Sequence, residues 1–254
     1  MIRRPPRSTR KESSAASDVY KRQLLTFYIG DIKKTTSDNR WTQLFNGNDL
    51  KGWEILNGKA EIKVSNNEII GKTVENTPNT FLCYKKDYKD FILEFEVNIE
   101  EGINSGVQIR SNSLSDYRNG VVHGYQIEID PSERAYSGGI FDEQRRGWLY
   151  DLSENKNGRD AFKVNEWNKF HIEAIGDTIR TWVNEVHCSY FVDSISDSGF
   201  IGLQVHGVGG MTKPNKYVKF RNIKIKTENF EDDLWPIMDD LKVINLKYEK
   251  KKVY

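Results

Sequence analysis

Phe-Ile-Leu-Glu-Phe-Glu-Val-Asn-Ile, residues 91–99, places an apolar side chain at every odd position and, from Glu94 onward, a polar one at every even position. A period of two residues is that of a β-strand, because successive side chains point to opposite faces of the sheet. One face of this segment is apolar and the other polar. The stretch therefore predicts a strand with one face in a hydrophobic core.

The same alternation recurs on both sides of this strand. Apolar and polar residues alternate at 107–110, 125–130 and 201–206, and further strands are expected at 61–64, 68–73, 80–84, 169–174 and 178–183. In residues 217–226 the apolar phase changes, which predicts a β-bulge at Arg221 and Asn222. Asn184-Glu185 between two strand-like runs predicts a tight hairpin. Many short strands without a long helical period indicate an all-β sandwich of two antiparallel sheets.

Length and composition agree with one main domain and exclude some classes of protein. The chain has 254 residues, 37% of them hydrophobic and 30% charged, and a formal net charge of +1. Balanced charge removes the electrostatic argument for nucleic-acid binding, so no nucleic-acid partner is expected. No apolar run approaches the roughly 20 residues that cross a bilayer, so no transmembrane segment is expected. The sequence leaves the oligomeric state open.

Changes of composition divide the chain into four parts. Residues 1–23 are rich in Arg, Ser and Lys, resemble translated sequencing-adapter read-through, and are interpreted as a non-native or disordered tail. Residues 24–40 are interpreted as a signal-peptide remnant and linker. The sandwich is expected over 41–227, and a short helical or irregular extension over 228–254. The signal remnant favours a periplasmic or extracellular bacterial protein.

Three of the strands turn polar side chains away from their apolar face. If these strands are neighbours, their polar groups line one cleft, whereas each strand taken alone would be interpreted as a solvated outer face. The residues concerned are Gln108 and Arg110, then Gln126, Glu128 and Asp130, and then Gln204 and His206.

Glu128 and Asp130 are the candidate acid and base of this cleft. Their Cβ atoms would lie about 6.6 Å apart along the strand. Close carboxyl groups have their pKa values pushed apart, so that one is an acid while the other is a base. The alternative is a structural carboxylate pair neutralised by Arg110 or a bound cation. His206, before Gly207, could exchange protons near neutral pH.

The segment 131–165 has little alternation and is interpreted as long loops over one face. Exposed aromatic rings beside charged groups suit sugars, which stack their C–H faces on aromatic surfaces and hydrogen-bond through their hydroxyls. The alternative for Trp148 is an anchor that holds the loop to the sandwich. Substrate-binding candidates in this segment are Tyr136, Asp142, Glu143, Arg146 and Trp148.

Several motifs together resemble the 3-keto-disaccharide hydrolase family. They are the segment Trp41-Thr-Gln-Leu-Phe-Asn-Gly-Asn-Asp-Leu-Lys-Gly-Trp53, and the segments at 104–110, 124–130, 166–168 and 202–207. The resemblance implies a concanavalin A-like jelly roll, usually exported by bacteria, that hydrolyses glycosides oxidised at C3. Glu128-Ile-Asp130 also resembles part of the E-x-D-x-E motif of jelly-roll glucanases. Gln126 replaces its first glutamate, which argues against an ordinary double-displacement glycosidase.

A 3-keto sugar allows another route, in which loss of the C2 proton is followed by elimination and then addition of water. The hypothesis assigns Glu128 or Asp130 as the base, Arg110 or a bound metal as the enolate stabiliser, and His206 as a second proton-transfer group. Gln108, Gln126 and Gln204 join the loop residues as substrate-binding candidates. No cofactor is required by the sequence, and a divalent cation stays open. The competing hypotheses are a non-catalytic carbohydrate-binding module and an interaction or adhesion sandwich.

Overall fold

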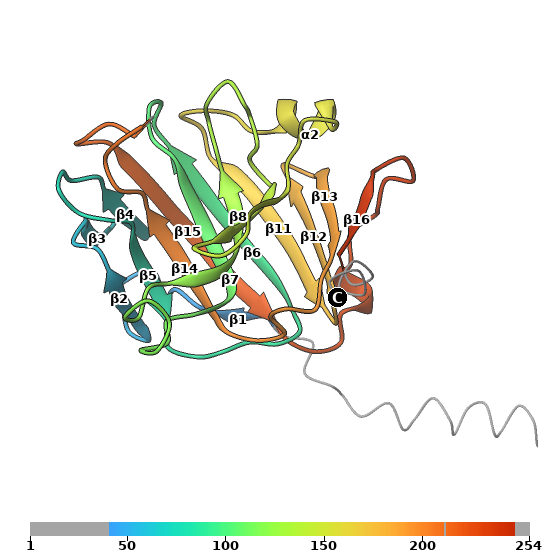
Figure 1. Ribbon diagram of the computed structural model, residues 1–254, viewed down its shortest axis with the longest axis horizontal. Helices are drawn as coiled ribbons and strands as arrows, with labels where there is room; N and C mark the ends of the chain where they lie inside the picture. The colour runs from blue at the N-terminus through green and yellow to red at the C-terminus, as the bar shows by residue number, and fades with distance from the viewer. Residues whose placement is uncertain (1–40, 211, 247–254) are drawn as a thin grey trace, which may run out of the picture. The chain divides into compact units, whose positions relative to one another are not determined.

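The computed structural model of the chain describes residues 41–210 and 212–246, which form two stacked β-sheets (Figure 1). The predicted tail and linker at 1–40 therefore lie outside the described residues. All strand pairs are antiparallel except β13 with β16, so the all-β, concanavalin A-like sandwich of two antiparallel sheets is confirmed. No helix in the described ranges is long and apolar enough to cross a membrane.

The large sheet has nine strands in the order β16-β13-β12-β11-β6-β15-β4-β3, with β1 pairing β15. Its strands are β1 (Thr42–Gln43), β3 (Glu61–Ser65), β4 (Glu68–Lys72), β6 (Phe91–Ile99), β11 (Asn168–Ile175), β12 (Thr178–Val183), β13 (Val186–Val192), β15 (Tyr217–Lys226) and β16 (Val243–Asn245).

The small sheet has seven strands in the order β10-β9-β8-β7-β14-β5-β2. Its strands are β2 (Trp53–Asn57), β5 (Thr80–Tyr84), β7 (Ser105–Asn112), β8 (His123–Ile129), β9 (Ile140–Glu143), β10 (Gly147–Tyr150) and β14 (Phe200–Val205). The single described α-helix, α2 (Lys156–Ala161), lies between β10 and β11 in the chain.

The hydrophobic core lies between the two sheets and contains the apolar face of the strand at 91–99. That strand is β6, which pairs with β11 on one side and β15 on the other. Phe95 stacks on Phe170 of β11, with ring centroids 4.9 Å apart and planes 12° apart. The inward side chains of β7 and β8 are fully buried against this layer. Burial on this face leaves the even-numbered residues of β8 on the outer surface of the small sheet.

Two local predictions are confirmed by the backbone. The pairing of β15 with β6 shifts register between Arg221 and Lys224, and Asn222 has φ of 53°, as the predicted bulge requires. Asn184 and Glu185 have φ of 47° and 69° between β12 and β13. Two successive positive φ values are those of a type I′ hairpin turn.

The segment 131–165 is not only loop, as the sequence predicted, because it contains β9, β10 and α2. The two strands have four residues each. These strands do not have the usual apolar inner face and polar outer face. Asp142 is buried among arginines, while Phe141 and Trp148 face the outer surface of the sheet. Such short strands leave too few residues for a period of two to be recognised.

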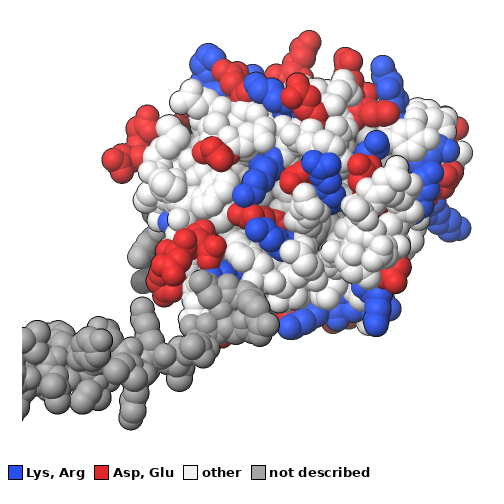
Figure 2. Space-filling model, turned by 180° about the vertical axis from the view of Figure 1, so that it is seen from behind, with Lys and Arg blue, Asp and Glu red and all other residues white. Residues whose placement is uncertain are grey.

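Residues 228–246, the described part of the predicted C-terminal extension, pack on the large sheet. They contain a 3-10 helix, Glu231–Asp233, and then β16, which adds parallel to β13. Trp235 stacks on the buried His171 ring at 4.2 Å, with planes 7° apart. The face seen in Figure 2 mixes side chains of both charge signs, as expected for a net charge near zero.

Candidate functional site

A groove of about 250 Å³ lies on the outer face of the small sheet, and is called here the Glu128 groove. Its walls come from β8, β9, β10, β14 and the loops at their ends, which places polar side chains beside aromatic rings. The lining residues are Asn104, Gln126, Glu128, Arg134, Phe141, Glu143, Trp148, Gln204, His206, Gly209, Gly210 and Thr212.

A chain of hydrogen bonds beneath the groove ends on Glu128. Ser111 Oγ donates to Gln108 Oε1 at 2.7 Å, and Gln108 Nε2 donates to Gln126 Oε1 at 2.7 Å. Gln204 Nε2 also donates to Gln126 Oε1, at 3.0 Å. Because its oxygen already accepts two hydrogen bonds, the Gln126 side chain is held with its amide donor on Glu128 Oε2, at 2.8 Å. A buried amide whose oxygen and nitrogen both have hydrogen-bond partners cannot flip, so it fixes the position of the carboxylate that it contacts.

Glu128 is a buried carboxyl group with two hydrogen bonds and, among residues 41–210 and 212–246, no directly paired cation. Asn104 Nδ2 donates to its Oε1 at 2.7 Å, and only 5% of the residue is exposed. Burial raises the pKa of Glu128 to about 7, the hydrogen bonds from Asn104 and Gln126 offset part of this effect, and the charge of Asp130 adds to it. A carboxyl group with a pKa near neutrality can both take up and release a proton at physiological pH.

Gly106 provides the space in which Gln126 lies. It pairs with Glu128 across β7 and β8, and a Cβ atom at this position would stand 2.4 Å from Gln126 Cδ. Such contacts do not occur between real atoms, so any side chain here displaces Gln126. The absence of a side chain at residue 106 is therefore a condition for the hydrogen bond between Gln126 and Glu128.

Gly106→Ala is expected to raise the pKa of Glu128 further, because the displaced Gln126 amide no longer stabilises the carboxylate. The midpoint of the Glu128 carboxyl titration, followed by NMR, should move to higher pH by about one unit for one lost hydrogen bond to a charged group. Gly158→Ala is the matched control, since its Cβ would stand 2.7 Å from Nδ2 of Asn155, an amide that donates to the His187 and Cys188 carbonyls and not to Glu128. An unchanged titration midpoint in Gly106→Ala would contradict the account.

Arg134 and the aromatic rings of Phe141 and Trp148 form one rim of the groove. The Arg134 guanidinium lies 5.5 Å from the Trp148 ring centroid and 5.8 Å from that of Tyr136. Trp148 meets Tyr136 and Phe141 edge to face, at 5.2 and 5.3 Å. Trp148 and Phe141 thus line the groove, whereas Tyr136 contacts Trp148 without lining it. The guanidinium and the rings together offer a sugar a hydrogen-bond donor and an apolar surface.

Asp130 lies outside the groove, contrary to the prediction that it shares the cleft with Glu128. It follows the last residue of β8, and its Oδ1 accepts a hydrogen bond from the Ser132 amide at 3.1 Å. Its Oδ2 accepts from Arg134 Nε at 2.9 Å. The alternation that placed Asp130 beside Glu128 ends with the strand. Asp130 therefore holds Arg134 in position at the rim.

Glu143, the last residue of β9, reaches across the groove to Asn79, the residue before β5. Three strands separate β9 from β5, so a flat sheet would place them about 19 Å apart. Asn79, the residue before β5, nevertheless donates from Nδ2 to Glu143 Oε1 at 3.3 Å. This contact brings the loop before β5 and the end of β9 together at the groove. Burial raises the pKa of Glu143, and the nearby His206 partly offsets this effect.

His206 follows β14, which is separated from β8 by β7 alone. It lines the groove together with Glu128. Its Nδ1 lies 2.7 Å from the Gly207 carbonyl oxygen, to which it donates, and 3.2 Å from Thr212 Oγ1. The same ring cannot donate from both nitrogens unless it is charged. The neutral ring therefore presents Nε2 as the nitrogen that exchanges a proton with a ligand.

Arg110 does not reach the groove, so its predicted place beside Glu128 is wrong. The β7–β8 register shifts between Ile109 and Asn112, and Arg110 has φ of 46°. The side chain is 1% exposed and donates to the carbonyl oxygens of Lys89 at 2.7 Å and Gly176 at 2.8 Å. Its Nη2 pairs with Asp90 at 3.1 Å. Arg110 therefore joins loops at the edge of the sandwich.

Arg110→Met is expected to lower the free energy of unfolding by about 2–3 kcal/mol, because the part-buried hydrogen bonds from its guanidinium to two carbonyl oxygens are lost. Denaturant unfolding measures this loss, and the NMR titration of Glu128 in the folded variant should keep the midpoint of the parent. Arg118→Met, an exposed arginine, is the control for loss of charge. A displaced Glu128 midpoint in the folded Arg110→Met variant would return Arg110 to the site.

Asp142 and Arg146 also differ from their predicted places, because they form a buried ion cluster instead of lining the groove. Asp142 pairs with Arg145 and Arg146, at 2.6 and 2.5 Å. Arg146 also pairs with Asp193 at 2.7 Å, and the Tyr125 hydroxyl donates to the same carboxylate at 2.5 Å. This cluster fixes the β9–β10 hairpin to the edge of the sandwich.

The structure thus brings six predicted residues together in the groove and places Gln108 directly beneath it. The six are Gln126, Glu128, Glu143, Trp148, Gln204 and His206. Sequence reasoning missed Asn104, Arg134, Phe141 and Thr212, of which only Asn104 lay in a quoted motif. Within residues 41–210 and 212–246, no group of three or more His, Cys, Asp and Glu side chains is placed to hold a metal ion.

The sandwich is similar in sequence to one family of known proteins. The sequence model of a 3-keto-alpha-glucoside-1,2-lyase-like domain matches residues 40–226, more than half of the chain. No curated protein matches the sequence.

Solved structures share the fold at low sequence identity. A candidate glycosyl hydrolase from Parabacteroides distasonis is 19% identical, with a TM-score of 0.54 over 74% of this chain and 94% of that one. A Bacillus subtilis protein of unknown function with a galectin-like fold is 12% identical, with a TM-score of 0.53 over 74% and 98%. The Emp47p carbohydrate recognition domain is 12% identical, with a TM-score of 0.50 over 76% and 99%. These likenesses support the fold alone.

Proposed function

The chain belongs to the family of 3-keto-alpha-glucoside-1,2-lyase-like domains, the 3-keto-disaccharide hydrolase family that its motifs resemble, and on this basis we propose that it cleaves 3-keto-glycosides by elimination. The observation that carries the proposal is Glu128, a buried carboxyl group whose pKa is raised to about 7 inside the groove. A ketone at C3 acidifies the C2 proton, and a positioned base of near-neutral pKa suits its removal.

In the proposed reaction Glu128 takes the proton from C2, and the electron pair of the C2–H bond forms the enolate at C3. Arg134, whose Nε is held by Asp130, stabilises the negative charge on the enolate oxygen. Collapse of the enolate restores the C3 carbonyl, forms the C1–C2 double bond and breaks the C1–O bond. His206, in its charged form with a proton on Nε2, gives that proton to the departing oxygen and is left as the neutral ring. Addition of water to the unsaturated product then completes a net hydrolysis.

The amides beneath the groove give Glu128 a fixed orientation, so the reaction needs little rearrangement at the base. Trp148 and Phe141 supply an apolar wall against which a sugar ring stacks. Gln204 Oε1 is buried and lacks a hydrogen-bond partner among the described residues, so it accepts from a substrate hydroxyl. We therefore assign Gln204 to substrate binding.

The test is to identify the product formed from a 3-keto-α-glucoside. An unsaturated 3-keto sugar, detected by NMR and by its ultraviolet absorbance, is the expected result. Release of the intact 3-keto sugar without this intermediate and without exchange at C2 would overturn the elimination. Binding of the substrate without any cleavage would instead support the second candidate, a non-catalytic carbohydrate-binding module, which the aromatic wall at Trp148 and Phe141 favours.

We further propose that the protein acts in the periplasm or outside the cell. The basis is the apolar stretch 24–29 followed by a polar segment, which is typical of a signal peptide joined to a mature N-terminus.

A further inference from the structure

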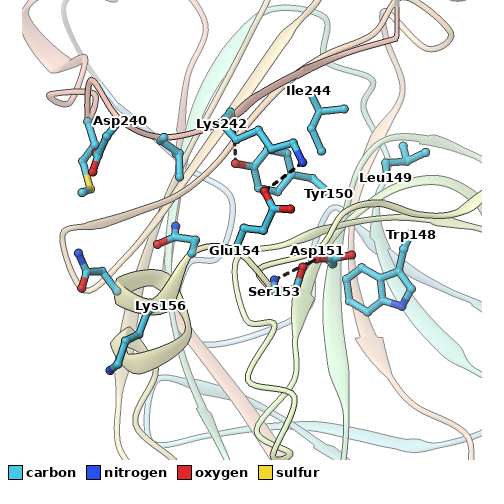
Figure 3. Close-up of a pocket in the computed structure, with 14 residues that line it drawn as sticks. Trp148, Leu149, Tyr150, Asp151, Ser153, Glu154, Lys156, Asp240, Lys242 and Ile244 are labelled. Carbon is cyan, nitrogen blue, oxygen red and sulfur yellow. Dashed lines mark hydrogen bonds and ion pairs between the residues drawn. The ribbon is translucent and has the colours of Figure 1, made fainter.

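A second cavity, of about 380 Å³, lies beside the edge strand β10 and is called here the β10 cavity (Figure 3). It is lined by residues of the segments 148–157 and 238–244, which come from β10, the turn after it, the start of α2 and the C-terminal segment. In the close-up, Trp148 and Lys156 lie at opposite ends of the cavity. The cavity thus extends away from Trp148 toward α2.

The walls of the β10 cavity are held together by direct contacts. The Tyr150 hydroxyl donates to the Lys242 carbonyl oxygen at 2.7 Å. Lys242 Nζ pairs with Glu154 Oε2 at 3.0 Å, which ties the C-terminal segment to the turn after β10. The pairing of β16 with β13 fixes the same segment to the large sheet. The cavity is therefore built from fixed elements of the fold.

Trp148 lines both the Glu128 groove and the β10 cavity. Its ring is positioned by edge-to-face contacts with Tyr136 and Phe141. Its indole N–H makes no hydrogen bond to any residue at 41–210 or 212–246. One aromatic side chain thus forms the boundary between the two spaces, with a donor available to a ligand that passes over it.

The lining of the β10 cavity suits a neutral polyhydroxylated ligand. Three acidic residues and two lysines line it, and Glu154 with Lys242 and Asp151 with Ser153 already satisfy one another. This balance disfavours a phosphate or another strongly charged group. Leu149, Leu241 and Ile244 add an apolar surface beside these polar groups. An apolar surface with a few polar groups is the usual composition of a sugar site.

The size of the Glu128 groove calls for a second space. Its volume of about 250 Å³ is below the roughly 300–1,000 Å³ of sites that enclose larger ligands. A groove of this size suits the one oxidised ring that reacts, so the leaving-group sugar is expected to extend past an edge of the groove. Trp148 forms an edge that offers an aromatic surface.

We propose that the β10 cavity binds the leaving-group part of the substrate, a neutral sugar ring that passes over Trp148. This inference rests on the proposed function, since it assigns the two sides of the scissile bond to two spaces. It makes the substrate class a disaccharide or longer glycoside rather than a glycoside with a small leaving group.

The test compares a 3-keto-disaccharide with methyl 3-keto-α-glucoside, whose leaving group is too small to enter the cavity. Leu241→Trp fills the β10 cavity without changing a residue of the groove. We expect kcat/KM for the disaccharide to fall about tenfold, and kcat/KM for the methyl glycoside to change by less than about twofold. Ile237→Trp is the matched control, because Ile237 is exposed and lines a neighbouring cavity instead. Equal effects on both substrates, or none, would overturn the proposal.

A binding experiment separates this inference from the proposed reaction. Saturation-transfer NMR with free glucose is expected to show contacts in the parent protein that weaken in Leu241→Trp and in the milder variant Asp240→Ala. If no elimination is found but these contacts are lost in both variants, the sugar site stands and the reaction fails. Unchanged glucose contacts in two folded variants would overturn the site.

Discussion

Glu128→Gln is expected to lower kcat/KM for a 3-keto-α-glucoside by about 10²–10⁴-fold, the usual contribution of a general base. The substitution preserves the shape of the side chain but removes the group that takes up a proton. Glu128 lies within the groove, where burial raises its pKa to about 7. KM should change little, because the groove walls and the aromatic rim remain. Steady-state kinetics on the folded variant measures both quantities.

Asp130→Asn is the control that separates the two carboxylates. Asp130 holds Arg134 and does not line the groove, so its variant should lose no more than about tenfold in kcat/KM. Circular dichroism and thermal melting show whether each variant is folded. If Asp130→Asn loses as much activity as Glu128→Gln, the assignment of the base to Glu128 is wrong.

The second large effect concerns the dependence of stability on pH. The pKa of Glu128 rises from an ordinary value of 4.5 to about 7 on folding. Between these pH values the unfolded chain has lost a proton that the folded protein keeps, so the free energy of unfolding falls as pH rises. At 1.36 kcal/mol per pH unit, this loss amounts to about 3 kcal/mol.

Glu128→Gln removes this contribution at every pH. We expect the free energy of unfolding of the parent to fall by about 3 kcal/mol more than that of the variant between pH 4.5 and pH 8. The comparison of pH dependences cancels any constant cost of placing an amide beside Asn104 and Gln126. Glu133→Gln, at an exposed carboxylate of the next loop, is the control. Parallel curves for the parent and Glu128→Gln would contradict the raised pKa.

Alternation in the sequence was sufficient to predict the sandwich and the centre of the groove. In β8 the odd-numbered residues enter the core and the even-numbered Gln126 and Glu128 line the groove, because the strand is regular at those positions. Gln204 follows the same rule in β14. The phase change at Arg221 and Asn222 identified a true bulge. These features depend on local period alone, which a single sequence contains.

Other parts of the site could not be predicted from local period. Arg110 follows a register shift that turns its side chain away, and Asp130 lies beyond the end of β8. Asp142 points inward because two arginines neutralise it there. Arg134 reaches the groove from the loop after β8, where Asp130 holds it, and Phe141 reaches it from the β9–β10 hairpin. These placements depend on contacts between segments that are distant in sequence, and the local period of apolar and polar residues does not reveal such contacts.

The central claim is that Glu128 removes the C2 proton of a 3-keto-glycoside, and exchange with deuterated water tests it most directly. The account predicts that the parent protein introduces deuterium at C2 of the recovered substrate or the hydrated product well above the buffer rate. Glu128→Gln should return the exchange to the buffer rate. Cleavage by the parent protein that leaves the original C2 hydrogen in place would contradict the claim.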